Sequence, residues 1–232
     1  MNRGFSMIEL MVVVILVGIL AVLAIPSMSE ASADRHVYQN AAKVADLIRG
    51  ARGRAVGRGA AVTVSMDTTT GTAGVFRMLE AVQRDPMPIT DGGAPGQVAP
   101  FSNCKTPMDW TQTPDLGIGT YGVHLVQSIT YAESAANIVS TLYIDDGTTT
   151  PTALTKAYIC FTPLGRAYAL PTSASGAATL SRAMFDTASP MMGTLGIQFA
   201  RMAGSSTVGL VRRVLIPPSG AARILSGPIP LL

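Results

Sequence analysis

The chain begins with a carboxylate set in an apolar segment. Glu9 stands between Ile8 and Leu10, and an uncharged apolar run continues to Ile25. A carboxylate inside such a run is expensive, and its default interpretation is functional. Where the run becomes buried, Glu9 needs a positively charged partner, because an isolated buried charge is costly. The chemistry indicated is charge pairing; the alternative is that Glu9 reaches the interface near a helix end.

A second candidate for chemistry is the pair Cys104 and Cys160, the only cysteines of the chain. In an oxidising, exported compartment such a pair favours one disulfide, and two unpaired thiols are the alternative. The two histidines, His36 and His124, have no metal-ligand spacing to the cysteines. We therefore predict no metal site.

Motifs for enzymatic chemistry are missing from the sequence. It has no Gly-x-Ser-x-Gly, no phosphate-binding loop and no His-Glu-x-x-His. Asp145 and Asp146 are adjacent carboxylates, but neighbouring residues of a strand point to opposite faces, and the following Gly147 favours a turn. We predict a protein that is not an enzyme, with no catalytic residue and no cofactor.

The apolar run that carries Glu9 has the length of a membrane span. Phe5–Ile25 contains 21 residues, which is about 31 Å of helix, and a hydrocarbon core is roughly 30 Å thick. We predict a transmembrane helix over 5–25, since a buried core helix rarely runs this far without a polar face. Ordinary secretion is a further alternative, in which cleavage after Ala33 releases a soluble protein that begins at Asp34.

The helix is predicted to continue beyond the span. Pro26 should kink it, because proline lacks the backbone donor and clashes with the preceding turn. The region 26–58 then reads as an amphipathic helix that ends between Gly57 and Gly59. Its apolar stripe recurs at spacings of four and three: Val37, Ala41, Val44, Ile48, Ala51 and Ala55.

The remainder, 59–232, reads as one β-rich globular head. Its candidate strands are apolar runs, often β-branched or aromatic, bounded by Gly, Pro, Asp or Thr. An irregular loop with six prolines and five glycines is expected at about 85–119. The fold class is therefore α+β, with a long N-terminal helix packed on an antiparallel head. The candidate strands are Ala61–Met66, Val75–Val82, Tyr121–Tyr131, Ile138–Ile144, Ala157–Thr162, Gly196–Arg201, Leu210–Ile216 and Ala222–Leu225.

The N-terminus resembles the prepilin signal of type IV pilins and type II secretion pseudopilins. The segment Gly4–Leu10 reads Gly-Phe-Ser-Met-Ile-Glu-Leu. The resemblance implies that prepilin peptidase removes a leader, residues 1–4, by cutting between Gly4 and Phe5, and that Phe5 becomes N-methylated. It also implies that Glu9 pairs with the freed amine of a neighbouring subunit and so fixes the axial register of assembly.

The junction between helix and strands is similar to the GspH/FimT type of minor pilin. The segment Ala51–Val56 reads Ala-Arg-Gly-Arg-Ala-Val and comes before the Val-Thr-Val strand at 62–64. Two later segments, Ile159–Arg166 and Val211–Gly220, also resemble that group. The region 67–155 carries no clear resemblance. This similarity implies a structural subunit rather than an enzyme.

The charges are unevenly distributed and leave a DNA-binding alternative open. The formal net charge is +3, and the tail 187–232 has four arginines and no acidic residue. Some members of the resembled group bind DNA through a Gly-Arg-x-Arg motif; the matching stretch, Gly220–Arg223, has Ala221 in place of the first arginine. Arg223, with Arg212 and Arg213, forms the DNA-binding candidate set, which we do not favour.

We therefore predict a minor pilin or pseudopilin in the tip or initiation complex of a type IV pilus or type II secretion pseudopilus. Its expected place is the inner membrane, as a single-pass protein with the head on the periplasmic side, and then the filament. The expected partners are prepilin peptidase, other pilins or pseudopilins and the inner-membrane assembly platform. The alternatives are a DNA-binding minor pilin for natural transformation and a soluble exported protein.

Overall fold

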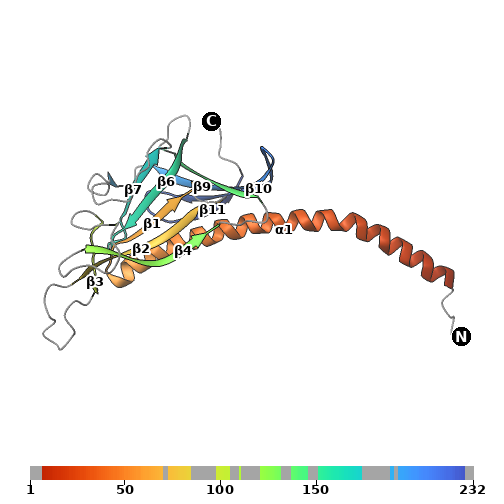
Figure 1. Ribbon diagram of the computed structural model, residues 1–232, viewed down its shortest axis with the longest axis horizontal. Coiled ribbons are helices and arrows are strands. Elements are labelled where there is room, and N and C mark those ends of the chain that lie inside the picture. Colours follow the sequence, from red (N-terminus) through yellow and green to blue (C-terminus); the bar gives the residue numbers. More distant parts are fainter. Residues whose placement is uncertain are drawn as a thin grey trace, which may run out of the picture.

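A computed structural model describes nine segments of the chain, which together form one long helix and a β-rich head (Figure 1). Within them, no side chain is described for 22–29, 84, 98, 170–173 and 189–190. The described segments are 7–69, 73–84, 98–104, 110, 121–131, 137–145, 151–173, 189–190 and 193–227.

The helix α1 (Met7–Arg58) runs along the head and projects far beyond it (Figure 1). Over the head, the predicted apolar stripe is buried, from Val37 to Ala55. The helix ends at Arg58 because Gly59 adopts the left-handed conformation, with φ of 68°. The predicted end between Gly57 and Gly59 is therefore confirmed. The helix continues through Pro26, and the kink at that residue stays a prediction.

In the described part of the head, eleven strands form one antiparallel sheet. Its main path runs β11-β10-β9-β5-β6-β1-β2-β3, with β4 paired to β2, β7 paired to β6, and β8 paired to β7. The α+β class is confirmed. The strands are β1 (Val62–Asp67), β2 (Val75–Arg84), β3 (Val98–Pro100), β4 (Tyr121–Thr130), β5 (Ile138–Asp145), β6 (Thr152–Phe161), β7 (Ala167–Ser173), β8 (Ser189–Pro190), β9 (Thr194–Ala203), β10 (Ser206–Ile216) and β11 (Arg223–Ser226).

The main core lies between α1 and the sheet face that the helix covers. Three aromatic rings, Phe76 of β2, Phe199 of β9 and Tyr131 after β4, form its centre, with ring centroids 6.0–6.1 Å apart. The edge-on and tilted arrangement of these rings is the one that aromatic quadrupoles favour. The aromatic core therefore brings β2 and β9 together, although β5, β6 and β1 lie between them in the sheet order.

A second, smaller core lies on the other face of the sheet. Cys160 alternates with Ile159 and Phe161 along β6, so it points away from the helix. It forms the predicted disulfide with Cys104, with the Cα atoms 6.0 Å apart. The Nε1 of buried Trp110 donates to the carbonyl of Cys104 at 3.1 Å. The described part of the irregular segment 85–119 is thus fastened over this face.

The eight predicted strands all correspond to strands, but three observed strands were not predicted. β6 begins at Thr152, five residues before its predicted start, because its first residues are exposed and carry no apolar alternation. β3 lies inside the segment that was expected to be irregular. β7 contains a proline, and β8 has two residues, so neither presents the apolar run by which strands are recognised.

Candidate functional site: the projecting helix and its junction with the head

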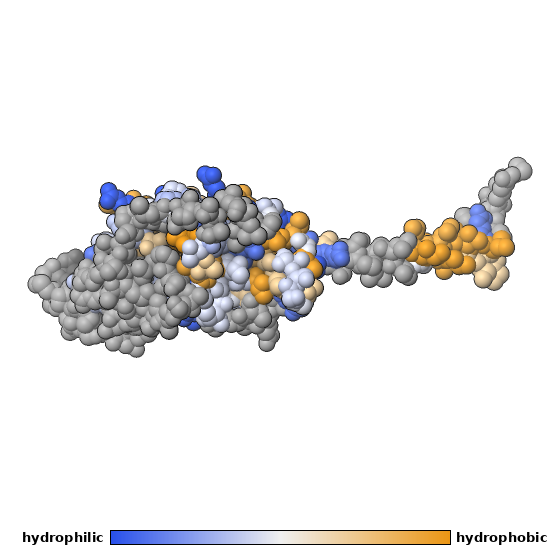
Figure 2. Space-filling view, turned by 90° about the horizontal axis from the view of Figure 1, so that it is seen from above, coloured by the Kyte–Doolittle hydropathy of each residue, from blue (hydrophilic) through white to orange (hydrophobic). Residues whose placement is uncertain are grey.

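The projecting part of α1 exposes a continuous apolar surface. From Met7 to Leu20, its large hydrophobic side chains are each about half exposed or more, and Met7 reaches 84%. Figure 2 shows this apolar band on the projecting end of the helix. Monomeric soluble proteins rarely expose contiguous apolar patches beyond a few hundred Å². The surface is therefore one that lipid or other protein surfaces would cover.

Glu9 lies within this apolar surface, in the first turn of α1. Its side chain is exposed between those of Ile8 and Leu10, and it forms no ion pair with the residues that the structure describes. A carboxylate in a first turn interacts favourably with the positive end of the helix dipole. The predicted processing residues, Gly4 and Phe5, lie outside the described residues. Over the part of the chain that the structure describes, no helix meets the length and hydropathy of a membrane span.

Among the described side chains of α1, Asp34 forms the first polar tie to the head. Its Oδ1 accepts a hydrogen bond from the backbone N–H of Leu210, at 3.1 Å. The register between β9 and β10 is irregular between Val208 and Arg212, which turns this N–H out of the sheet ladder. Gly209 has φ of 74°, and a Cβ at that position would stand 2.3 Å from the Asp34 carboxylate. Only glycine allows the helix and this bulge to approach so closely.

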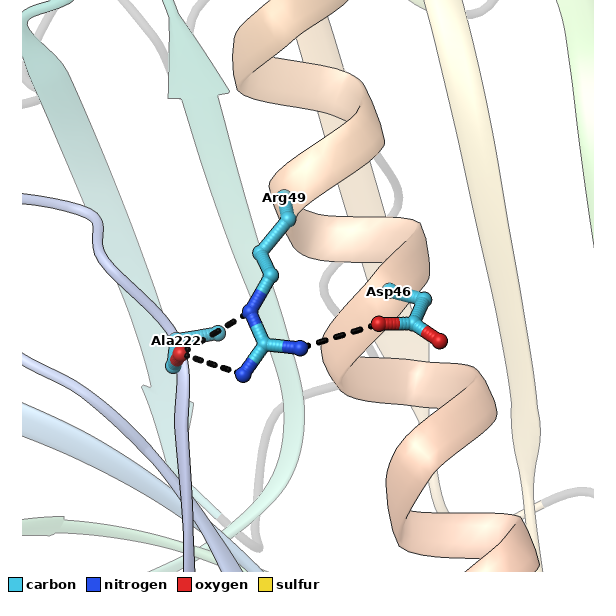
Figure 3. A network of polar contacts seen from close by, with 3 residues as sticks. All are labelled: Asp46, Arg49 and Ala222. Carbon is cyan, nitrogen blue, oxygen red and sulfur yellow. Dashed lines mark hydrogen bonds and ion pairs between the residues drawn. The ribbon is translucent and has the colours of Figure 1, made fainter.

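Two further ties follow along the helix. The hydroxyl of Tyr131 donates to the backbone carbonyl of Asn40 at 3.0 Å, and burial raises the pKa of this tyrosine. Arg49 donates from Nε and Nη2 to the carbonyl of Ala222, at 3.2 and 3.0 Å, and pairs with Asp46 at 2.9 Å (Figure 3). Because the planar guanidinium donates to a carbonyl and a carboxylate at the same time, the orientation of the Arg49 side chain is fixed.

The C-terminal end of the helix is held by a buried carboxylate. Glu80 of β2 is 2% exposed, and its two oxygens accept hydrogen bonds from Nε of Arg54 and Nε of Arg58, at 2.5 and 2.7 Å. Burial of a charge is tolerated where partners satisfy it, and two guanidiniums do so here. This group is a structural clamp between α1 and the sheet.

The DNA-binding candidates Arg212 and Arg213 do not form one patch. Arg212 of β10 faces the helix, with its guanidinium carbon 5.6 Å from the ring centroid of Tyr38, and it donates to the hydroxyl of Ser226. Strand alternation places Arg213 on the opposite face. There it lies beside Tyr143; burial raises the pKa of this tyrosine, and the nearby guanidinium acts against that rise.

The third candidate, Arg223, is exposed on β11. Its partner in the register is Leu215, two residues after Arg213 on β10. Arg213 and Arg223 therefore share the face of the sheet that is turned away from the helix, and Arg212 is separated from both. As to metals, no three His, Cys, Asp or Glu side chains come together among the described residues.

The residues that join helix and head were missed by sequence reasoning. Asp34 and Leu210 are 176 residues apart, and Arg49 and Ala222 are 173 apart. Neither pair has a local spacing that would reveal it. A partial signal was present for Glu80, because it is the one acidic residue of Val75–Val82, a predicted strand that is apolar apart from Glu80 and Arg77.

The comparisons with known proteins bear on the N-terminus. No curated protein and no solved structure matches the chain. Residues 1–25 match the family described as the prokaryotic N-terminal methylation motif. This is the signature found at the start of type IV pilin-like proteins. The chain therefore carries a type IV pilin-like N-terminus on a long helix that is fastened to an antiparallel β-rich head.

Proposed function

We propose that this protein is a minor pilin or pseudopilin, a structural subunit of the tip or initiation complex of a type IV pilus or type II secretion pseudopilus. The observation that carries the proposal is the methylation motif at 1–25 placed on a helix whose apolar side chains are exposed. Pilin-like proteins are structural and not catalytic. In this proposal, the projecting helix is first held in the inner membrane, with the head on its periplasmic side.

Assembly follows from the same surface. When the subunit leaves the bilayer, its apolar helix is buried against the helices of other subunits. Glu9 then needs a positive partner in that bundle, which the freed amine of a neighbouring Phe5 would supply. Prepilin peptidase provides that amine by cutting after Gly4. The inner-membrane assembly platform and other pilins or pseudopilins are the remaining proposed partners.

The processing step tests the proposal directly. N-terminal mass spectrometry of the mature protein from its native host should find methylated Phe5. Gly4→Leu should prevent the cut and leave Met1 or Asn2 at the terminus, whereas the matched control Gly18→Leu should be processed normally. A mature protein that begins at Asp34 would instead establish ordinary secretion and overturn the proposal.

A further inference from the structure

The end of α1 borders a groove that none of the roles above uses. The groove has a volume of about 620 Å³ and separates the helix from the segment that leads into β11. We call it the helix-end groove. It is lined by Arg49, Arg52, Gly53, Val56 and Gly57 of the helix and by Gly220, Ala221 and Ala222.

Small residues make the helix-end groove accessible to a backbone. At Gly53 and at Gly57, an added Cβ would meet no atom within 4 Å. Both positions are therefore open towards solvent, and an approaching chain can come close to the helix there. The opposite wall is held in place, because Arg49 binds the carbonyl of Ala222 with two of its nitrogens (Figure 3).

One exposed apolar side chain lines the groove, and a second belongs to a turn beside it. Val56 is 56% exposed in its lining, and Leu164 is 83% exposed at the turn after β6. That turn is tightly built, because Gly165 donates its N–H to the carbonyl of Thr162 at 2.8 Å and has φ of 74°. A Cβ on Gly165 would stand 3.7 Å from Nη2 of Arg52, so the turn lies against the groove. An exposed leucine beside a pocket offers apolar area that a docked chain can remove from water.

The charge around these apolar groups is positive. No Asp or Glu is found among the described residues that line the groove. Arg49 is already held by Asp46 and Ala222 (Figure 3). Arg52 forms no ion pair with the residues that the structure describes. One guanidinium in the groove is therefore free to receive an anion.

We propose that the helix-end groove docks an acidic and apolar peptide segment of a neighbouring subunit. An apolar side chain of that segment packs against Val56 and Leu164, and a carboxylate pairs with Arg52. A peptide fits better than a nucleic acid, because a phosphate backbone is bound by several free cations along its path, and here one is free beside two apolar side chains. This inference rests on the proposed function, since it places the groove within the assembled complex.

The test uses the full chain in its native host. A photo-activated crosslinking amino acid at Val56 should give an adduct with another subunit that carries an N-terminal methylation motif, and the crosslinked peptide should contain Asp or Glu. The matched control is the same amino acid at Gln39, exposed on the same helix, which should give no such adduct. Arg52→Glu and Leu164→Ser should each lower the adduct yield about tenfold. Arg52→Lys should keep most of it, and Arg35→Glu should leave it unchanged.

The outcomes separate this proposal from the one on which it rests. Methylated Phe5 and normal incorporation, together with no adduct from position 56, would overturn the groove proposal alone. An adduct with DNA would also overturn it, as would an adduct whose yield is unchanged by Arg52→Glu. Absence of methylated Phe5 would overturn the proposed function, and the groove proposal with it.

Discussion

The two halves of α1 meet their surroundings in opposite ways. Between Met7 and Leu20, the helix exposes apolar side chains, and Glu9 is the carboxylate among them. Between Val37 and Ala55, it buries one apolar stripe in the main core. The second half is an ordinary amphipathic helix, whereas the first is apolar around its circumference, as helices covered on all sides are. The difference indicates that the buried stripe of the second half serves the fold and that the first half serves contacts outside the fold.

The charged side chains of the two halves also differ in whether they have a partner in the head. In the second half and at its two borders, four charged residues are joined to the head: Asp34, Arg49, Arg54 and Arg58. In the first half, Glu9 has no partner among the described residues. Its partner is expected from another chain. The comparison therefore predicts that changes in the first half affect assembly and leave the head stable, while changes at the buried or head-bound residues of the second half do the reverse.

The largest expected effect is that of Glu9→Ala. Loss of one partner of a buried charge pair costs about 3 kcal/mol or more, so incorporation into the filament or its initiation complex should fall by about a hundredfold. Membrane insertion should persist because the segment becomes more apolar. Quantitative immunoblotting of the sheared filament and membrane fractions measures both. Glu30→Ala, a change of the same kind farther along the helix, is the control; equal incorporation of the two variants would show that Glu9 does not direct assembly.

The disulfide gives the next largest effect, confined to the head. Cys104 and Cys160 enclose a loop with a sequence separation of 56, for which the chain-entropy relation gives about 4 kcal/mol. The double variant Cys104→Ser, Cys160→Ser should lower the free energy of unfolding by up to that amount. Chemical denaturation followed by Trp110 fluorescence measures it, and the oxidised and reduced wild-type protein provide the internal control. No difference between those two states would contradict the prediction.

A smaller loss is expected from the clamp at the end of α1. Glu80→Gln removes the charge that Arg54 and Arg58 share, and we expect a loss of about 2–3 kcal/mol in unfolding free energy. Asp46→Asn, which alters an exposed pair on the same helix, should cost under about 0.5 kcal/mol. Thermal unfolding of both variants measures the two losses, and a clamp requires the larger loss for Glu80→Gln. Equal melting temperatures would mean that Glu80 does not fasten the helix.

DNA binding should be weak near 0.15 M salt, because Arg212 is separated from Arg213 and Arg223 by the sheet. A fragment that begins at Glu30 keeps the Asp34 tie and suits a titration against duplex DNA. Ala221→Arg restores the first arginine of the resembled motif and should strengthen binding and steepen its salt dependence. Micromolar binding by the unchanged head, abolished by Arg212→Ala, Arg213→Ala and Arg223→Ala together, would support a DNA-uptake role instead.

The smallest effect concerns the pair between Asp67 and Lys156, 3.0 Å apart on β1 and β6. Burial acts to raise the pKa of Asp67, but hydrogen bonds from Thr69 and Lys156 outweigh it and hold this pKa below its ordinary value. The hydrogen bond to Asp67 raises the pKa of Lys156. The Asp67 contribution to stability is thus present above its unfolded pKa of about 3.9 and is lost as pH falls through the lower folded-state value.

The Lys156 contribution has the opposite sign. It is present below the unfolded pKa of about 10.4 and is lost as pH rises through the higher folded-state value. Asp67→Asn should therefore cost under about 1 kcal/mol near neutral pH, and the difference from wild type should vanish in strong acid. Urea denaturation of both proteins, near neutral pH and in strong acid, measures this difference in unfolding free energy. A difference that stays constant with pH would show that packing, and not charge, underlies the effect.

Sequence reasoning succeeded where the signal is local. The stripe from Val37 to Ala55 repeats within one helix, and β-branched runs such as Val62–Val64 mark strands whatever lies opposite them. An acidic residue in the apolar run likewise drew attention to Glu9, whose role in assembly stays a prediction. The disulfide followed from there being only two cysteines.

The rest depends on contacts between distant segments. Nothing near Asp34 shows that the Leu210 N–H is released by a bulge, and nothing near Arg52 shows that Gly165 lies against it. The pairing and register of the strands also determine which arginines share a face of the sheet. Alternation along β10 separates Arg212 from Arg213, but only the register with β11 brings Arg223 onto the face of Arg213.

The contact between Asp34 and the bulge at Gly209 has a mechanical consequence. It is the first polar tie where the helix leaves the head, and Glu9 lies 25 residues before it. That distance makes a lever of about 38 Å, so a tilt of roughly 10° at Asp34 displaces Glu9 by about 6–7 Å, more than one turn of helix. The close approach that glycine permits at position 209 therefore influences where the Glu9 carboxylate lies at the far end of the helix.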